Sequence, residues 1–381
     1  MHIFNDNKRV SPIYHRALSL TISKDFASQQ YGRISQVQQQ DSEQTNPRRE
    51  LLAIETAAKQ EKIIKSHGQT HFKTQMMEKF FASLTTQVNK EFDNTENLYH
   101  NVLHIEDAAP SILEILSVKA ASLKRIIPLA NSLNWLADEL VNLVNKPQYR
   151  KRADVQVTNS NLAISYIGLD NLKLVMPTFM LKHWLPASTS PFPLMKRKLW
   201  NNGLSVALAA SVLAEEEGVD TFTAFSAGML SNIGYLAVTR CFLQTYHELH
   251  KEELQQAYEN KDKKLYDALI DFTLSPELIL EQLIARNGKI AADMVELMRF
   301  DRLQITEAVF DLGYTSTFNN MCAVAKIVAK AKAYITFRSL AKEELISNAE
   351  AKALLSSVNS TPQNIALLKS NDIDHIKLHF S

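Results

Sequence analysis

The stretch of residues 196–235 constrains the fold of this chain more than any other, because it predicts two helices joined by a tight turn. Apolar residues in its first half recur three and four positions apart, which is the spacing of a buried helix face. Gly218 predicts the end of the first helix, since glycine adopts the left-handed conformation of a helix C-terminus without a steric penalty. Asp220 or Thr221 can then cap the second helix with a side-chain oxygen.

The second helix is predicted to run from Phe222 to Leu236, and it contains two glycines. Each of them, Gly228 and Gly234, costs about 1 kcal/mol relative to alanine inside a helix. We therefore expect another segment to pack closely against both. On the first helix we expect Trp200 to be a buried packing anchor, whose replacement by alanine would cost about 3–5 kcal/mol.

The composition predicts an all-α protein. The chain has 381 residues, of which 45% are hydrophobic, and this is ample for a buried core. It contains nine glycines and few alternating β-branched residues, which argues against strands. The formal net charge of +1 gives no general electrostatic reason to bind nucleic acid or an anionic membrane. We expect a cytoplasmic protein, because no secretory signal and no run of about 18 apolar residues is visible.

The two halves of the central stretch, LWNNGLSVALAASVLA and AFSAGMLSNIGYLAV, resemble the signature helices of HDOD proteins, bacterial relatives of the HD and HD-GYP metal-dependent phosphohydrolases. In the family pattern the first helix carries a histidine where this chain has Asn202. The second helix carries a His-Asp pair where this chain has Ser231 and Asn232. In HD enzymes such side chains hold metal ions that activate water. Because Asn and Ser lack both imidazole nitrogen and negative charge, we expect no metal, no cofactor and no catalytic residue here.

Two earlier segments extend the resemblance. IIPLANSLNW resembles the HDOD element that ends in Ala-Asn-Ser, and VTNSNLAISYIGLDNLKLVMP resembles a segment in which a helix stops at Gly168. Asn131 and Ser132 also suit the simpler role of ending a helix by satisfying its last carbonyls. The family-motif positions that could take part in binding are Asn131, Ser132, Gly168, Trp200, Gly228 and Gly234.

The resemblance implies an HD-domain-like (HDOD) multi-helix bundle with extra N- and C-terminal helices. The four predicted parts are a poorly ordered polar lead (residues 1–46), an N-terminal helical arm (47–106), an HDOD-like domain (107–309) and a C-terminal helical extension (310–381). Within the lead, residues 13–20 could form a short docked element, while the surrounding Gln, Ser and Asn argue against order. Within the arm, Gly68 is predicted to divide two helices.

We interpret the chain as a non-catalytic signal-transduction or regulatory protein that binds a protein or a small ligand. The expected partner is a protein of unknown identity, which could be a second copy of the chain, and neither nucleic acid nor membrane is expected. The arm carries Phe72, Met76, Phe80 and Phe81 on one side, and such residues favour a protein–protein surface.

Two alternative functions stay open. The first is a metal-dependent phosphohydrolase or phosphodiesterase that uses ligands outside the family motif. The second is a DNA-binding regulator, because ITEAVFDLGYTSTFNNM resembles the turn of an AraC-type helix-turn-helix. The run that would form its recognition helix, FNNMCAVAKIVA, is mostly apolar, whereas base readout requires exposed polar or cationic side chains.

Overall fold

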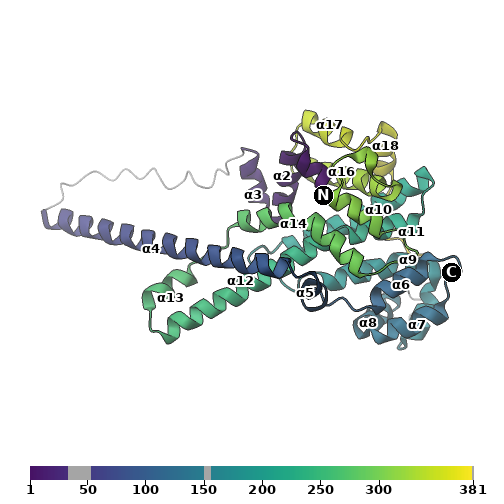
Figure 1. The fold of residues 1–381 in the computed structure, drawn as a ribbon, viewed down its shortest axis with the longest axis horizontal. Coiled ribbons are helices and arrows are strands. Elements are labelled where there is room, and N and C mark those ends of the chain that lie inside the picture. The colour runs from purple at the N-terminus through teal and green to yellow at the C-terminus, as the bar shows by residue number, and fades with distance from the viewer. Residues whose placement is uncertain (33–52, 150–155, 380–381) are drawn as a thin grey trace.

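The computed structural model describes residues 1–32, 53–149 and 156–379, and within these ranges the chain forms helices and no strand (Figure 1). The predicted all-α fold is therefore confirmed. In the same part of the chain, no helix combines the length and the apolar character that crossing a lipid bilayer would require.

The helices follow one another in three groups along the chain. The N-terminal group contains α1 (His2–Asp6), α2 (Ser11–Ile22), α3 (Lys24–Gln30), α4 (Ala53–Phe92), the short α5 (Thr95–Asn97) and the π-helical turn η2 (Leu98–Val102). The central group contains α6 (Ala108–Ser117), α7 (Leu123–Ser132), α8 (Asn134–Val144), α9 (Ser160–Trp184), α10 (Met195–Glu217), α11 (Thr221–Leu230), α12 (Ile233–Glu259), α13 (Lys263–Ile270) and α14 (Pro276–Leu297). The C-terminal group contains α15 (Thr306–Tyr314), the 3₁₀ turn η3 (Phe318–Asn320), α16 (Ala323–Lys342), α17 (Asn348–Ser356) and α18 (Pro362–Ser370).

The turn between α10 and α11 is built as the sequence predicts. Gly218 ends α10 with φ 68° and ψ 27°, which is the left-handed conformation. Asp220 caps α11, because its carboxylate accepts a hydrogen bond of 2.7 Å from the backbone N–H of Thr223. Earlier in the domain, Gly168 interrupts α9 with φ 75° and ψ 163°, so the predicted helix end at this glycine is also confirmed.

The predicted second helix differs from the observed one, because α11 ends at Leu230 and α12 begins at Ile233. The side chains of Ser231 and Asn232 both donate hydrogen bonds to the carbonyl of Gly228, at 2.8 and 2.7 Å. In a continuous helix that carbonyl would accept the backbone N–H of Asn232, which bonds instead to the carbonyl of Met229. Local side-chain bonds thus compete with the helix and form a turn.

Close packing at the two glycines of this region is confirmed. A Cβ added to Gly228 would lie 2.7 Å from the Cα of Ala207 on α10, and one added to Gly234 would lie 1.9 Å from the backbone oxygen of Asn287 on α14. Real Cβ atoms do not approach so closely, so both positions require the absence of a side chain. The glycines bring α10, α11, α12 and α14 together in the centre of the bundle.

The N-terminal lead is ordered over its first part, contrary to the prediction for residues 1–46. Residues 1–32 contain α1, α2 and α3, and α2 includes the element expected at residues 13–20. Phe4, Ile13 and Ile22 are fully buried, and α2 packs on α10, α14 and α16. The polar composition of this segment led to the wrong prediction of disorder, because helices from distant parts of the chain cover its few apolar residues. Residues 33–46 lie outside the described residues.

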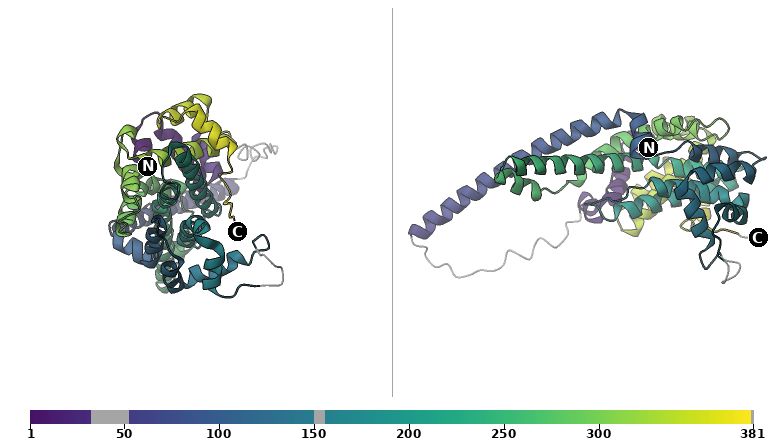
Figure 2. Two further views of the ribbon diagram at one scale, coloured as in Figure 1. Left: turned by 90° about the vertical axis from the view of Figure 1, so that its right-hand side faces the viewer. Right: turned by 90° about the horizontal axis from the view of Figure 1, so that it is seen from below.

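The arm is one helix rather than two, since α4 continues through Gly68. It lies beside α12 and α13, and together these helices project from the bundle (Figures 1 and 2). Phe80 is buried among aromatic rings of the same chain, with ring centroids 6.0 Å from Tyr246 and 5.6 Å from Phe272. The same chain therefore covers part of the aromatic face for which a protein–protein surface was predicted.

Candidate functional site

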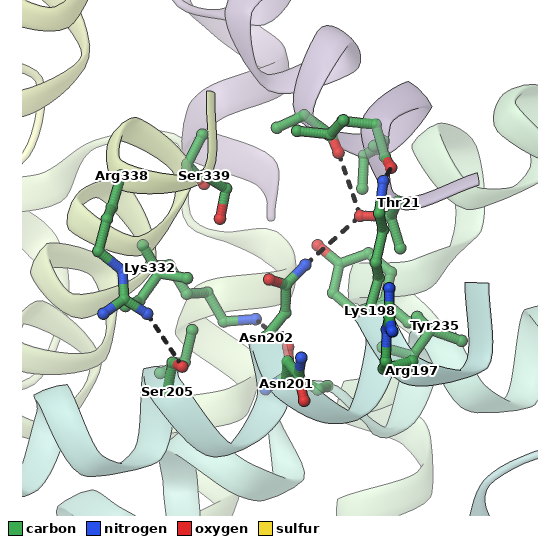
Figure 3. A pocket seen from close by; sticks show the side chains of 18 of the residues that line it. Thr21, Arg197, Lys198, Asn201, Asn202, Ser205, Tyr235, Lys332, Arg338 and Ser339 are labelled. Atoms are coloured by element: carbon green, nitrogen blue, oxygen red, sulfur yellow. Dashed lines mark hydrogen bonds between the residues drawn. The ribbon is translucent and has the colours of Figure 1, made fainter. Parts of the chain in front are cut away.

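A cavity of about 740 Å³ lies where α2, α10, α12 and α16 meet, beside the turn between α11 and α12 (Figure 3). Its walls come from three parts of the chain, because α2 belongs to the N-terminal group and α16 to the C-terminal group. Cavities of about 300–1,000 Å³ are typical of sites for small molecules. The cavity is therefore the candidate functional site.

The structure brings the degenerate metal-site positions to this cavity. Asn202 on α10 and Asn232 on the turn both line it. The amide of Asn202 donates to the hydroxyl of Thr21 on α2 at 3.4 Å, and Ser231 is buried directly beside Asn232. Two positions at which the family pattern has metal ligands, Asn202 and Asn232, therefore line the same cavity.

Lys332, on α16, enters the space beside these residues. Its Nζ atom lies 3.1 Å from the backbone oxygen of Ser231 and 3.3 Å from Oδ1 of Asn232, and it donates a hydrogen bond to each. The residue is only 8% exposed, and burial lowers the pKa of its ammonium to about 7. The ammonium also lies 5.3 Å from the centre of the Tyr235 ring, a cation–π distance.

Lys332 was not among the site residues predicted from the sequence. One feature of the sequence could have pointed to this residue: Lys332 stands at a core position of its helix. Val328 and Ile335, four residues before it and three residues after it, lie on the same helix face, and both are buried. A lysine among buried apolar residues is unusual unless a partner receives its charge. That pattern could have marked the position, but not the partners, which lie about one hundred residues away in the sequence.

Two tyrosines form another wall of the cavity. The hydroxyl groups of Tyr14 on α2 and Tyr235 on α12 share a hydrogen bond. Burial raises the pKa of Tyr14 to about 12 and that of Tyr235 well above its ordinary value, so both phenols are neutral at physiological pH. The pair joins the N-terminal helices to the HDOD-like bundle.

Cations outnumber carboxylates in the lining. The charged lining residues are Arg197, Lys198, Lys332, Arg338, Lys342, Glu343 and Asp374. Arg338 forms two hydrogen bonds with Asp374, of 2.6 and 3.1 Å, and Glu343 is paired with Lys24 at 2.6 Å. Both carboxylates are thus neutralised by single cations, and the remaining charge of the walls is positive.

The other family-motif positions lie away from this chemistry. Of the residues whose structure is described, the cavity lining includes none of Asn131, Ser132, Gly168, Trp200, Gly228 and Gly234. Asn131 donates to Asn161 at 2.8 Å and accepts from Ser160 at 2.7 Å, so it ties the end of α7 to the start of α9. Ser132 donates to the carbonyl of Leu129 at 2.7 Å. These contacts suit the helix-terminating role.

Trp200 is partly exposed and packs against the core from α10, so the expectation of a buried anchor is only half met. The partial exposure of Trp200 follows from its position on the helix, because the preceding residue, Leu199, is buried and the following residue, Asn201, is exposed. Trp200 therefore lies at the border of the buried helix face.

One group of acidic and thiol side chains lies elsewhere in the described residues, at Glu307, Asp311 and Cys322. One of its two carboxylates already has local partners, since Asp311 accepts hydrogen bonds from the backbone N–H of Cys322 at 2.7 Å and from the hydroxyl of Thr315 at 3.0 Å. These bonds fasten the end of α15 to the start of α16. A structural role accounts for the group.

The helical bundle, with the turn after α11 in the wall of a cavity, has the architecture that the resemblance to HD-domain proteins implies. Residues 103–274 match the family model of the HDOD domain. The resemblance to the HDOD family is therefore confirmed over these residues. No curated protein matches the sequence.

Solved structures similar to the chain include the following two. One is described as "Putative phosphohydrolase" from Shewanella amazonensis, with 16% identity, a TM-score of 0.45, and coverage of 74% of this chain and 92% of the other. The second is an HDOD domain protein with unknown function from Geobacter sulfurreducens, with 17% identity, a TM-score of 0.41, and coverage of 70% of this chain and 87% of the other.

Proposed function

We propose that this chain is a non-catalytic HDOD protein that acts in signalling or regulation by binding, and that its HD site holds no metal ion. The observation that carries the proposal is the position of Lys332, whose ammonium contacts the backbone oxygen of Ser231 and the side-chain oxygen of Asn232. A cationic side chain thus uses the oxygen atoms that a metal ion would need.

The donor set does not fit a divalent cation. Asn202, Ser231 and Asn232 supply neutral groups, and the carboxylates of the lining are engaged by Lys24 and Arg338. A divalent ion about 4 Å from a charged lysine would meet a repulsion of about 8 kcal/mol at an effective dielectric constant of about 20.

The phosphohydrolase alternative would need ligands other than the three replaced residues. The group at Glu307, Asp311 and Cys322 is the one set of metal-capable side chains found close together in the described part of the chain, and none of the three lines the cavity. The site chemistry therefore favours binding over hydrolysis.

Metal analysis of the purified full chain tests this proposal. After dialysis against manganese, iron or zinc, we expect much less than one ion per chain and no hydrolysis of bis(4-nitrophenyl) phosphate. Asn131→Ala serves as a control, because Asn131 is exposed and outside the cavity. The proposal would be overturned if wild type and Asn131→Ala kept one metal ion per chain after dialysis and Asn232→Ala did not. The metal-dependent phosphohydrolase would then be the favoured function.

A further inference from the structure

We propose that the cavity between α2, α10 and α16 binds a soluble small ligand that carries phosphate groups, with the ammonium of Lys332 beneath it and Arg197, Lys198 and Lys342 around it. This inference rests on the proposed function, because a lysine rather than a metal ion would meet the phosphate. It goes beyond that function by giving the chemical class of the ligand.

The first support is the charge of the walls. Among the described residues, no ion pair joins Arg197, Lys198, Lys332 or Lys342 to a carboxylate, whereas both carboxylates of the lining have their own cation. Lys198 instead donates to the backbone oxygen of Leu20. Arg197, Lys198 and Lys342, together with Lys332 when it is protonated, produce a positive potential that attracts a multivalent anion. Phosphate groups are anions that accept several such hydrogen bonds.

The second support is the state of Lys332. An ammonium has three N–H donors, and here two of them have acceptors, at 3.1 and 3.3 Å. The residue lines the cavity and is only 8% exposed, so the charge is removed from water without a carboxylate to balance it. A phosphoryl oxygen would supply both the third acceptor and the missing negative charge.

The groups that face Lys332 carry no negative charge that would repel an incoming anion. They are the Tyr235 ring on α12, the phenol of Tyr14 on α2 and the amides of Asn202 and Asn232, all neutral at physiological pH. Burial, and to a smaller extent the charge of Lys332, lowers the pKa of the amino group of Met1 to about 4, so this group is also neutral at physiological pH. No carboxylate of the described residues hydrogen-bonds to Lys332, so an anion would not have to displace one.

The third support is the size and polarity of the space. A volume of about 740 Å³ exceeds what inorganic phosphate needs and suits a ligand of nucleotide size. Figure 3 shows Lys332 and Asn202 reaching into the same space, with Thr21 and Lys198 on its far side and Ser205 and Ser339 nearby. Hydroxyl and amide groups at these positions can bind the uncharged part of such a ligand.

Calorimetric titration of the full chain in metal-free buffer with EDTA tests the proposal. The probes are pyrophosphate, ATP and adenosine, the last lacking phosphate. We expect pyrophosphate and ATP to bind and adenosine to bind at least tenfold more weakly. Lys332→Met should weaken pyrophosphate binding at least tenfold, because it keeps the shape of the side chain and removes the charge.

Two further variants keep the test informative if Lys332→Met folds poorly. Arg197→Gln combined with Lys342→Gln alters two exposed residues, so the protein should stay folded and bind pyrophosphate several times more weakly. Lys251→Met, on an exposed face of α12 outside the lining, should bind as wild type does. Circular dichroism and thermal unfolding verify the fold of each variant.

The proposal is overturned if folded wild type binds neither pyrophosphate nor ATP, or if the cavity variants bind both as wild type does. Binding of a single-stranded oligonucleotide without binding of pyrophosphate would also overturn it and indicate a nucleic-acid surface instead. Because EDTA is present throughout, these outcomes are independent of the metal analysis. A chain that holds no metal and binds no phosphate refutes this inference alone, whereas stoichiometric metal refutes the proposed function.

Discussion

The Nζ atom of Lys332 lies 3.3 Å from Oδ1 of Asn232, so a side chain from the C-terminal helices reaches the position where the HD pattern has an acidic metal ligand. The two residues are 100 positions apart in the sequence. A neutral amide beside a buried lysine is chemically consistent with the proposal that no metal ion binds here, because the lysine ammonium contacts the amide oxygen. This relationship links the family pattern to both proposals above.

The first prediction concerns the pH dependence of stability. Burial lowers the pKa of Lys332 from 10.5 to about 7. Below about pH 7 the lysine is charged in both the folded and unfolded chains, and its desolvation penalty is present in full. Between the two pKa values the unfolded chain keeps a proton that the folded chain has released, so stability rises with pH. We expect the free energy of unfolding of Lys332→Met, relative to wild type, to fall by about 3 kcal/mol from about pH 6.5 to about pH 9.5.

Urea unfolding of both proteins at several pH values measures this difference. Lys326→Met, on the same helix but partly exposed, is the matched control and should show a constant difference across the range. A constant difference for Lys332→Met as well would show that the ammonium is not destabilised by burial.

The second prediction compares two glycines. Gly234→Ala should destabilise the protein by about 3 kcal/mol or more, because the new Cβ would overlap the backbone oxygen of Asn287 and a backbone cannot rotate away. Gly218→Ala should cost only about 1 kcal/mol, since its Cβ meets nothing within 4 Å and the cost comes from the positive φ. Thermal unfolding of both variants gives the comparison, and equal losses would contradict the close packing of α12 on α14.

The third prediction compares two tryptophans. Trp184 is fully buried, so Trp184→Ala should cost about 3–5 kcal/mol through the cavity it leaves. Trp200 is partly exposed, and Trp200→Ala should cost about 2 kcal/mol, less than the sequence analysis predicts. Denaturant unfolding measures both. A Trp200 variant with unchanged stability and altered ligand or partner binding would make it a recognition residue.

The fourth prediction concerns deletion of residues 1–92. The deletion removes Phe4 and Ile13 from the core and uncovers the α12 face that packs on Phe80, so we expect the remaining chain to lose cooperative thermal unfolding. Phe80→Ala alone should leave a folded protein that is about 3–4 kcal/mol less stable. A cooperatively folded deletion with altered self-association would instead support the partner surface that the sequence analysis places on this arm.

Local patterns in the sequence were sufficient for the central features of the fold. The turn at Gly218 and Asp220 depends on residues within a few positions of one another, and so its chemistry can be read directly from the chain. The same holds for the replaced motif residues Asn202, Ser231 and Asn232, whose identities alone predict a poor metal site.

The break between α11 and α12 was missed because the apolar pattern continues across it, while two side-chain hydrogen bonds to Gly228 end the helix. The order of residues 1–32 was missed because their polar composition conceals a few apolar side chains whose cover comes from α14 and α16. The cavity depends on the same distant contacts. Only the tertiary structure brings Lys332 to Asn232 and Tyr14 to Tyr235. The free energy of each contact depends on how deeply it is buried, and the residues that bury it are distant in the sequence, so local residue spacing does not identify them.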